Sequence, residues 1–395
     1  MSLHGVRLME NERASSIAKS KRKLIVVKVG TSSLTLKDGS LSMEEMKRLV
    51  DQIAEAVGKG FRIVLVTSGA VASGVAELKA KFNPNDLVFK QVCAAAGQSI
   101  LMAHYRELFK RHGLKVAQIL LTKEDLSNRV SYVHTCNVLD GLLRLGVVPI
   151  VNENDVTSVD ELKPVTEGYE VNFSDNDILS VLIANAIQAD LVVLLSNVDG
   201  LYTMNPKNPE AELITLVEKV TPELKASVEG KSLLGRGGMK TKLQAADIAT
   251  RSGIPVIVAN SFREGILLDA LSGKPVGTLF KPVDRMSGMK KWIAYGASLK
   301  GRIVVNEGAE KAIVKGASLL PIGISEVSGH FDIGDVVGLF GQDGERLGRG
   351  MTNYSSDEVS AIKGMRSSQV SKVLGYIREK EVITRKYIHL EAEKQ

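Results

Sequence analysis

The sequence predicts an α/β protein: a three-layer αβα sandwich built on a mainly parallel sheet, followed by a small β-rich domain. Through the first two thirds of the chain, near-continuous runs of Val, Ile and Leu alternate with segments whose apolar residues recur at helical spacing. This alternation is typical of a parallel sheet that helices cover on both faces. After residue 284 the apolar runs shorten, glycine becomes frequent and helical patterns become few, which indicates a second domain of mainly β structure.

The first predicted strand is Leu24–Val29, whose sequence LIVVKV fits a fully buried strand. Met43–Val57 predicts a helix, because its apolar residues return every three or four positions. Further strands are predicted at Ile63–Val66, Val116–Leu121, Val147–Val151, Leu191–Leu195 and Pro255–Val258. In the last part of the chain, β-type runs are predicted at Ile303–Val305, Leu319–Ile322 and Val336–Phe340. In a parallel sheet of this kind, ligands bind beyond the carboxyl ends of the strands.

Three segments are expected along the 395 residues: a basic tail at 1–22, an α/β domain at 23–284 and a β-rich domain at 285–391. This length favours two domains, because single cores stop growing at about 250–300 residues. A polar segment, Val156–Phe173, interrupts the alternation and contains Pro164 and Gly168. We expect it to form a hairpin or a lid over the site.

Composition excludes several classes of function. The formal net charge is +6, from 51 basic and 45 acidic residues, which suits anionic substrates without indicating a nucleic-acid binder. Cys93 and Cys136 form no CxxC pair, so neither a structural zinc site nor a disulfide framework is expected. No apolar stretch is long and uninterrupted enough for a membrane span, and the N-terminal residues lack the apolar core of a secretory signal. We therefore expect a cytoplasmic protein.

Polar residues directly follow the first two predicted strands. Lys28–Ser32 (KVGTS) ends the first strand, where a buried lysine is costly unless it meets an anion. Its Gly-Thr-Ser turn offers N–H groups and hydroxyls to a phosphate, although a surface lysine before an ordinary turn explains the pattern equally well. Thr67–Ala70 (TSGA) opens a helix, whose N-terminus favours negative charge. Ser and Thr are also ordinary helix caps.

Three further segments carry candidate chemistry. Asn152–Asp155 (NEND) follows a strand, and Asp155 could bind an ammonium group or form an Asx turn. Ser174–Asp177 (SDND) opens a helix, where Asp177 could hold lysines in place or cap the helix. Gly235–Lys242 (GRGGMKTK) could wrap phosphates and neutralise their charge, or form a solvated loop. The chain contains neither a Walker A motif nor a strand-linked G-x-G-x-x-G fingerprint.

Taken together, these five segments resemble the amino acid kinase family. Lys28–Ser32 is similar to the family's opening phosphate motif, and its Thr-Ser turn resembles the glutamate-phosphorylating branch more than the acetylglutamate or uridylate kinases. The other matching segments follow in the family's order: Asn152–Asp155, Asp175–Asp177, Leu195–Tyr202 and Gly237–Lys242. Residues 286–390 resemble a PUA domain, a small module often found in RNA-modifying enzymes, through Gly308–Ala312, Gly316–Pro321, Phe331–Val337 and Gly348–Gly350.

The resemblance implies a role for individual residues. Lys28 and Lys242 would flank the transferred phosphoryl group, and Asp177 would hold both lysines. The amino acid would be bound by Ser68, Asp155 and Asn176. ATP would be bound by Lys28, Gly30, Ser196, Asn197, Arg236, Gly237, Gly238, Met239, Lys240, Thr241 and Lys242. Asn197 stands where the family commonly has Asp, and Arg236 where Thr is common, so we expect an altered affinity for ATP.

The implied reaction is ATP-dependent phosphorylation of the side-chain carboxylate of L-glutamate to L-glutamyl 5-phosphate, the first step of proline biosynthesis. Mg²⁺ would bridge the ATP phosphates without a dedicated protein cage. The resemblance also implies a homo-oligomer, feedback inhibition by proline and RNA binding through the PUA-like domain. Two alternatives stay open: a family member acting on acetylglutamate, aspartate or UMP, and an RNA-binding protein whose kinase domain is vestigial.

Overall fold

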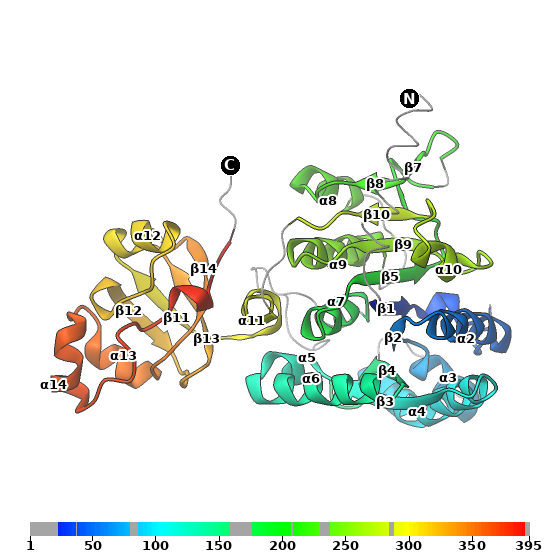
Figure 1. Ribbon diagram of the computed structural model, residues 1–395, viewed down its shortest axis with the longest axis horizontal. Helices are drawn as coiled ribbons and strands as arrows, with labels where there is room; N and C mark the ends of the chain where they lie inside the picture. The colour runs from blue at the N-terminus through cyan, green and yellow to red at the C-terminus, as the bar shows by residue number, and fades with distance from the viewer. Residues whose placement is uncertain are drawn as a thin grey trace. The chain divides into compact units, whose positions relative to one another are not determined.

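The computed structural model describes residues 23–36, 38–79, 86–158, 176–206, 208–229, 238–283 and 288–391 (Figure 1). The chain divides into two compact units. The first holds the residues up to Lys123 together with Thr135–Arg285, and the second holds Glu124–His134 together with the residues from Met286 onward.

The first unit is built on an eight-stranded sheet with the order β3-β4-β2-β1-β5-β9-β10-β8. Its strands are β1 (Leu24–Val29), β2 (Arg62–Val66), β3 (Lys115–Leu121), β4 (Val147–Glu153), β5 (Leu191–Ser196), β8 (Leu216–Val217), β9 (Val256–Asn260) and β10 (Thr278–Phe280). All neighbouring strands are parallel except β9 and β10. The six strands predicted for this domain are confirmed, whereas β8 and β10 are too short for the sequence pattern to predict.

Helices cover both faces of the sheet, as predicted (Figure 1). On one face lie α2 (Met43–Gly58), α4 (Leu87–Lys110) and α10 (Ile266–Leu271). On the opposite face lie α7 (Asn176–Ala186), α8 (Pro222–Glu229) and α9 (Met239–Arg251). Successive side chains of β1 point to opposite faces. Val27 therefore packs with the α2 and α4 side, and Lys28 belongs to the α7 side.

Two glycines set a close approach between α4 and α3 (Ala70–Leu78). A Cβ atom at Gly97 would lie 1.9 Å from the carbonyl oxygen of Ala70, and one at Gly74 would lie 1.8 Å from that of Cys93. Gly69 precedes α3 with a φ of 111°, a conformation that favours glycine. These contacts fix the start of α3 against α4, directly after the end of β2.

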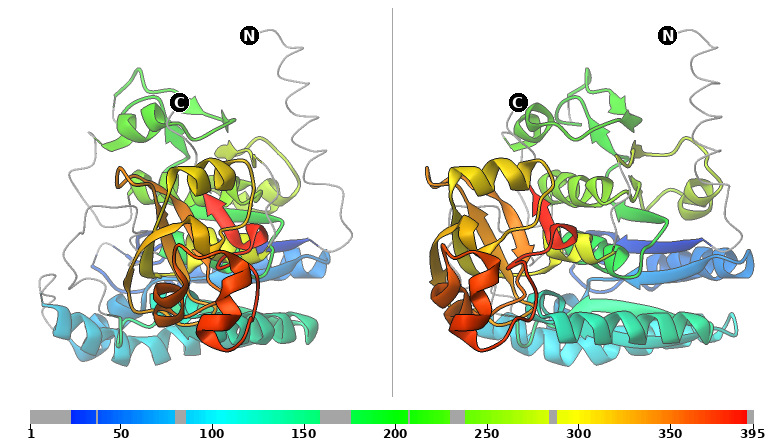
Figure 2. Two further views of the ribbon diagram at one scale, coloured as in Figure 1. Left: turned by 90° about the vertical axis from the view of Figure 1, so that its left-hand side faces the viewer. Right: turned by 60° about the vertical axis from the view of Figure 1, so that its left-hand side comes forward.

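The second unit contains a five-stranded sheet with the order β12-β11-β13-β14-β15 (Figure 2). Its strands are β11 (Leu299–Val305), β12 (Ile324–Gly329), β13 (Val336–Phe340), β14 (Arg346–Met351) and β15 (Ile388–Leu390). Its helices include α11 (Gly288–Lys291), α12 (Glu307–Val314), α13 (Ser356–Ile362) and α14 (Val370–Leu374). One core, which includes Ile303, Phe331 and Tyr354, joins this sheet to the helices. The predicted β-rich second domain is confirmed.

One strand prediction in this unit is wrong. Leu319–Ile322 is not a strand: Leu319 forms an isolated bridge with Ile383, and a 3₁₀ turn begins at Pro321. The physical reason is that proline has no backbone N–H for a strand ladder. The sequence pattern also misses the short helices α12, α13 and α14.

The remaining elements of the first unit are short or peripheral. They are β6 (Leu201–Tyr202) and β7 (Leu213–Ile214), whereas all of α5 (Lys123–Ser127) but its first residue belongs to the second unit, and α6 (Arg129–Arg144) has residues in both. The α6 helix begins in residues of the second unit and ends in those of the first. Within the described ranges, none of the helices is both long and apolar enough to cross a membrane.

Candidate active site

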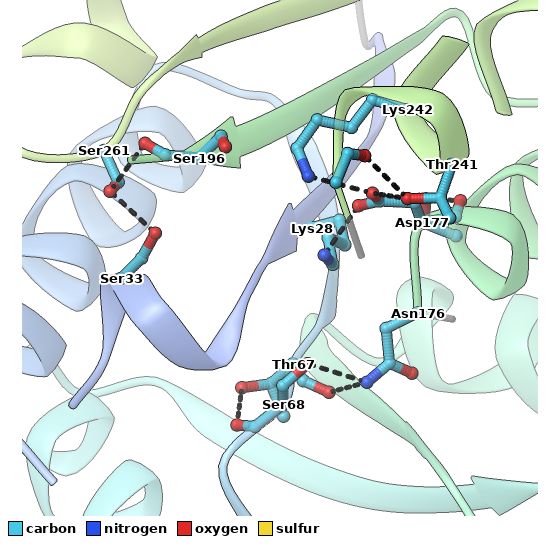
Figure 3. Close-up of polar contacts among 12 residues, drawn as sticks. Lys28, Ser33, Thr67, Ser68, Asn176, Asp177, Ser196, Thr241, Lys242 and Ser261 are labelled. Atoms are coloured by element: carbon cyan, nitrogen blue, oxygen red, sulfur yellow. Dashed lines mark hydrogen bonds and ion pairs between the residues drawn. The ribbon is translucent and has the colours of Figure 1, made fainter. Parts of the chain in front are cut away.

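The first group of site residues meets around Asp177 at the beginning of α7 (Figure 3). Lys28 Nζ lies 2.6 Å from Asp177 Oδ1, and Lys242 Nζ lies 3.0 Å from Asp177 Oδ2. The three side chains come from β1, α7 and α9, and their exposed fractions are 6%, 0% and 7%. Two buried ammonium groups therefore share one buried carboxylate.

The carboxyl of Asp177 is ionised in this setting. Burial by itself raises its pKa, but the charges and hydrogen bonds of Lys28 and Lys242 outweigh burial and hold the pKa below its ordinary value. Asp177 also lies in the first turn of α7, where the helix dipole favours a negative charge. The lysines are held in place because their common partner is itself fixed on a buried helix.

The start of α9 joins the same group. The single hydroxyl hydrogen of Thr241 is shared between Asp177 Oδ2, 3.2 Å from Oγ1, and the Gly238 carbonyl oxygen, 2.9 Å from it. Gly238 is the N-cap of α9, so the N–H groups of the first turn lie beside the lysines. Gly30, the residue after β1, lies next to the same group: a Cβ atom there would be 3.4 Å from Lys28 Nζ. Glycine thus keeps the space next to this ammonium group open.

A second group forms around the amide of Asn176, next to Asp177 in the sequence (Figure 3). Asn176 Nδ2 shares its two hydrogens among three acceptors: the Thr67 carbonyl oxygen at 2.9 Å, Ser68 Oγ at 2.8 Å and Asn152 Oδ1 at 3.1 Å. Asp155 is half-buried and follows β4 by two residues. The structure therefore brings Ser68 and Asn176 into direct contact at the carboxyl ends of β2 and β4.

Two residues that support this second group, Gln98 and Tyr105, are not predicted from the sequence. Asn152 Nδ2 donates to Gln98 Oε1 at 3.0 Å, and the hydroxyls of Thr67 and Tyr105 lie 2.7 Å apart. Burial raises the pKa of Tyr105 above its ordinary value, so its phenol stays protonated. Gln98 and Tyr105 both lie on the face of α4 that carries the buried Leu101. Polar residues on the buried face of an amphipathic helix are the sequence signal that could have found them.

The third group lies at the carboxyl ends of β5 and β9. Ser261 Oγ donates to the Ser196 carbonyl oxygen at 3.0 Å, and the hydroxyls of Ser261 and Ser33 lie 2.8 Å apart. Ser196 is buried, and the side chain of Asn197 lies beside it, with their polar atoms 3.4 Å apart. These contacts attach the turn after β1 to the ends of β5 and β9 (Figure 3).

The phosphate loop is only partly within the described residues. Met239 is half-buried and Lys240 is exposed, both in the first turn of α9. Arg236 and Gly237 lie outside the described residues, as does the predicted lid beyond Ser158. Among the residues that the structure does describe, no three His, Cys, Asp or Glu side chains gather as a metal site.

The geometry suits the transfer of a group that carries negative charge. Two lysines and the start of α9 converge on one point, where they can bind and stabilise phosphate oxygens. The Ser68–Asn176 pair lies beside it, with hydrogen-bonding groups suited to a polar small molecule. The only carboxylate of the first group is neutralised by both lysines, so it acts as a positioning group and not as a base.

Comparisons with known proteins show which family the sequence is similar to. The profile of the amino acid kinase family matches residues 23–260, and that of the PUA domain matches residues 301–374. A glutamate 5-kinase of Dehalococcoides mccartyi is 46% identical over 367 residues, 92% of this chain and 97% of the relative. Similar enzymes from Thermus thermophilus (44% over 373 residues, 94% and 98%) and Thermoanaerobacter pseudethanolicus (43% over 365 residues, 91% and 96%) also match.

Proposed function

This chain belongs to the amino acid kinase family, on its glutamate 5-kinase branch, and we propose that it transfers the γ-phosphoryl group of ATP to the side-chain carboxylate of L-glutamate. The product is L-glutamyl 5-phosphate, and the reaction is the first step of proline biosynthesis. The single observation that carries the proposal is the carboxylate of Asp177 between Lys28 and Lys242. The similarity to curated glutamate 5-kinases supports the choice of acceptor.

The two lysines supply what this reaction needs from the protein. The acceptor and the nucleotide are both anions, and the nucleophile is already an ionised carboxylate, so no general base is required. Lys28 and Lys242 bring the two anions together and stabilise the charge of the phosphoryl group during transfer. Asp177 prevents the ammonium groups from repelling each other and fixes the direction in which each one points.

The acceptor amino acid binds at the Ser68–Asn176 pair. Ser68 Oγ accepts from Asn176, so its own O–H can donate to the α-carboxylate of glutamate. Asn176 Oδ1 and Asp155 attract the α-ammonium group. These contacts place the side-chain carboxylate toward Lys28, because Asn176 and Asp177 are consecutive at the start of α7.

ATP binds along the first turn of α9 and the end of β5. The phosphates are surrounded by the start of α9: Gly238, Met239, Lys240, Thr241 and Lys242. Arg236 and Gly237 precede these residues in the sequence and bind ATP with them. Ser196 and Asn197, at the end of β5, also bind the nucleotide. Mg²⁺ fits as an ion that arrives with the ATP phosphates, and it would neutralise part of their charge. The carboxylate of Asp177 is engaged by two lysines.

Four finer properties complete the proposal. The enzyme is cytoplasmic and homo-oligomeric, proline inhibits it, and its PUA domain binds RNA. The family membership of the chain and the match of residues 301–374 to the PUA domain support these properties. Gel filtration, a proline titration of turnover and salt-dependent RNA binding test the last three separately.

The decisive experiment measures ADP release while hydroxylamine traps the acyl phosphate. L-glutamate is compared with aspartate, N-acetylglutamate and UMP as acceptors. Hydroxamate with glutamate alone is the expected result, and Lys28→Ala should lower its kcat by about 10²–10³. Turnover with a different acceptor would support kinase activity but contradict glutamate as the substrate. Inactivity with every acceptor, together with salt-dependent RNA binding, would favour the vestigial-kinase alternative.

A further inference from the structure

Three side-chain amides form a continuous chain from α4 to the acceptor site. Gln98 Oε1 accepts from Asn152 Nδ2 at 3.0 Å, and Asn152 Oδ1 accepts from Asn176 Nδ2 at 3.1 Å. We call these three residues, Gln98, Asn152 and Asn176, the amide relay. It links three elements, α4, β4 and α7, that are distant from one another in the sequence.

Backbone groups determine which way each amide of the relay faces. The Thr67 carbonyl can only accept, so Asn176 must turn its nitrogen toward it. The Glu153 N–H can only donate, at 2.9 Å, so Asn152 must turn its oxygen toward it. Asn152 Nδ2 then faces α4, where Gln98 supplies the acceptor.

The end of the relay at the acceptor site has an unused hydrogen-bonding atom. Asn176 Oδ1 is buried and has no hydrogen-bond partner among the described residues. Figure 3 shows this oxygen turned away from Thr67 and Ser68, which both receive the nitrogen of the same amide. A buried acceptor without a partner is costly, and a cationic N–H group of a ligand would satisfy it.

We propose that Gln98 is a positioning residue for the α-ammonium group of the acceptor, acting through Asn152 and Asn176. This inference rests on the proposed function, because it takes an amino acid as the acceptor. Gln98 holds Asn152 in place, and Asn152 helps the Thr67 carbonyl and Ser68 Oγ to fix the nitrogen of Asn176, so that Asn176 Oδ1 stays directed at the ammonium group. Gln98 itself does not need to touch the substrate.

Because Asn152 is buried, its position depends strongly on its hydrogen bond to Gln98. Asn152 is 2% exposed, so without Gln98 its Nδ2 group would be left without an acceptor. Turning the amide over would not help, because Nδ2 would then face the Glu153 N–H and the Asn176 nitrogen, which are both donors. Loss of Gln98 therefore displaces Asn152 and removes one of the three acceptors that orient Asn176.

The test compares two acceptors that differ only in the ammonium group, L-glutamate and glutarate. The readout is the ratio of their kcat/KM values in the hydroxamate assay. Gln98→Met, which removes the acceptor oxygen, should lower this ratio about tenfold, because a hydrogen bond to the ammonium group is weakened. Gln98→Glu, which keeps an acceptor for Asn152, should retain most of the ratio. A merely structural role would lower both kcat/KM values together and leave the ratio unchanged.

Gln52→Met is the matched control. Gln52 is also a half-buried glutamine on a helix, and its Oε1 accepts from the Leu267 N–H at 2.9 Å, away from the relay. Its ratio should equal that of the unmodified protein. An unchanged ratio in Gln98→Met, or an equal fall in Gln52→Met, would overturn the positioning role.

A substrate-free measurement separates failure of this inference from failure of the proposed function. If the unmodified protein makes no hydroxamate with glutamate, the proposed function fails. In that case the amide relay is tested without substrate, by recording the side-chain amide NMR signals of protein labelled with ¹⁵N at asparagine. Gln98→Met should shift the signals of both Asn152 and Asn176, and Gln52→Met should shift neither. An Asn176 signal that does not move would overturn the relay.

Discussion

Replacing Asp177 by Asn tests whether one carboxylate holds the site together. The change keeps the shape of the side chain but removes the negative charge between two lysines that are 6% and 7% exposed. Their ammonium groups would then repel each other without a common partner. Removing one member of a buried ion pair costs about 3–5 kcal/mol. At about 2–4 °C per kcal/mol, that lowers the melting temperature by about 6–20 °C.

The effect of Asp177→Asn on catalysis should exceed its effect on nucleotide binding. Without the carboxylate, Lys28 and Lys242 move apart, and misplacement of a positioning group by about 1 Å can cost about 10²-fold in rate. The added positive charge still attracts ATP. We therefore expect kcat in the hydroxamate assay to fall by about 10² or more, while KM for ATP rises little.

The matched control is Asp247→Asn on α9. Asp247 also lies between two cations, 2.6 Å from Lys225 Nζ and 2.7 Å from Arg251 Nε, but these partners are 37% and 43% exposed. Ion pairs with exposed partners contribute about 0–1 kcal/mol, so unfolding and kcat should change little. An Asp177→Asn protein with normal kcat, or one no less stable than Asp247→Asn, would refute the reasoning.

Further predictions concern individual residues and pH. Lys242→Ala should lower kcat by about 10²–10³ with a smaller change in KM for glutamate, and a near-normal kcat would reject its role. Asp155→Ala should raise KM for glutamate about tenfold or more, and an unchanged KM would place the ammonium contact elsewhere. Gly97→Ala should destabilise the protein to urea by about 1–3 kcal/mol, because its Cβ would meet the α3 backbone. Gly141→Ala, a helical position with open space, should stabilise it by about 0.5–1 kcal/mol, and equal effects of the two changes would contradict the packing argument. The pKa of Asp177 is lowered, so its stabilising contribution is complete above the ordinary value of about 3.9 and is lost as pH falls through the folded-state pKa. The difference in unfolding free energy between the unmodified protein and Asp177→Asn should thus be constant from pH 7 to about pH 5 and shrink below about pH 4.

The sequence by itself determined the main strands of the first unit and the polar segments that follow them, where the site residues lie. Leu24–Val29 is a strand with the predicted bounds, and Met43–Gly58 is the predicted helix extended by one residue. Both follow from local patterns: an unbroken apolar run for a buried strand, and a repeat of three or four residues for one buried helix face. The polar segments after the strands were equally visible, because a polar run that interrupts apolar periodicity is a local signal.

Local patterns predicted secondary structure less well where a proline interrupted a strand or where a strand was very short. Pro321 turned a predicted strand into a 3₁₀ turn, since its missing N–H cannot join a ladder. The antiparallel strand Thr278–Phe280 has only three residues, too few to show a period. Its pairing with Val256–Asn260 depends on where the chain returns to the sheet, between β9 and β8.

Only the tertiary structure decided which polar residues meet. Lys28, Asp177 and Lys242 each occupy a plausible local position in the sequence, but nothing local states that one carboxylate lies between the two lysines. The partnership of Gln98 with Asn152 was likewise invisible, because it depends on how closely α4 approaches the end of β4. These contacts join residues far apart along the chain, and their distances are set by strand order and by helix packing at Gly97. A sequence pattern reports the environment of a residue, whereas the identity of its partner across the sheet depends on the packing of the whole unit.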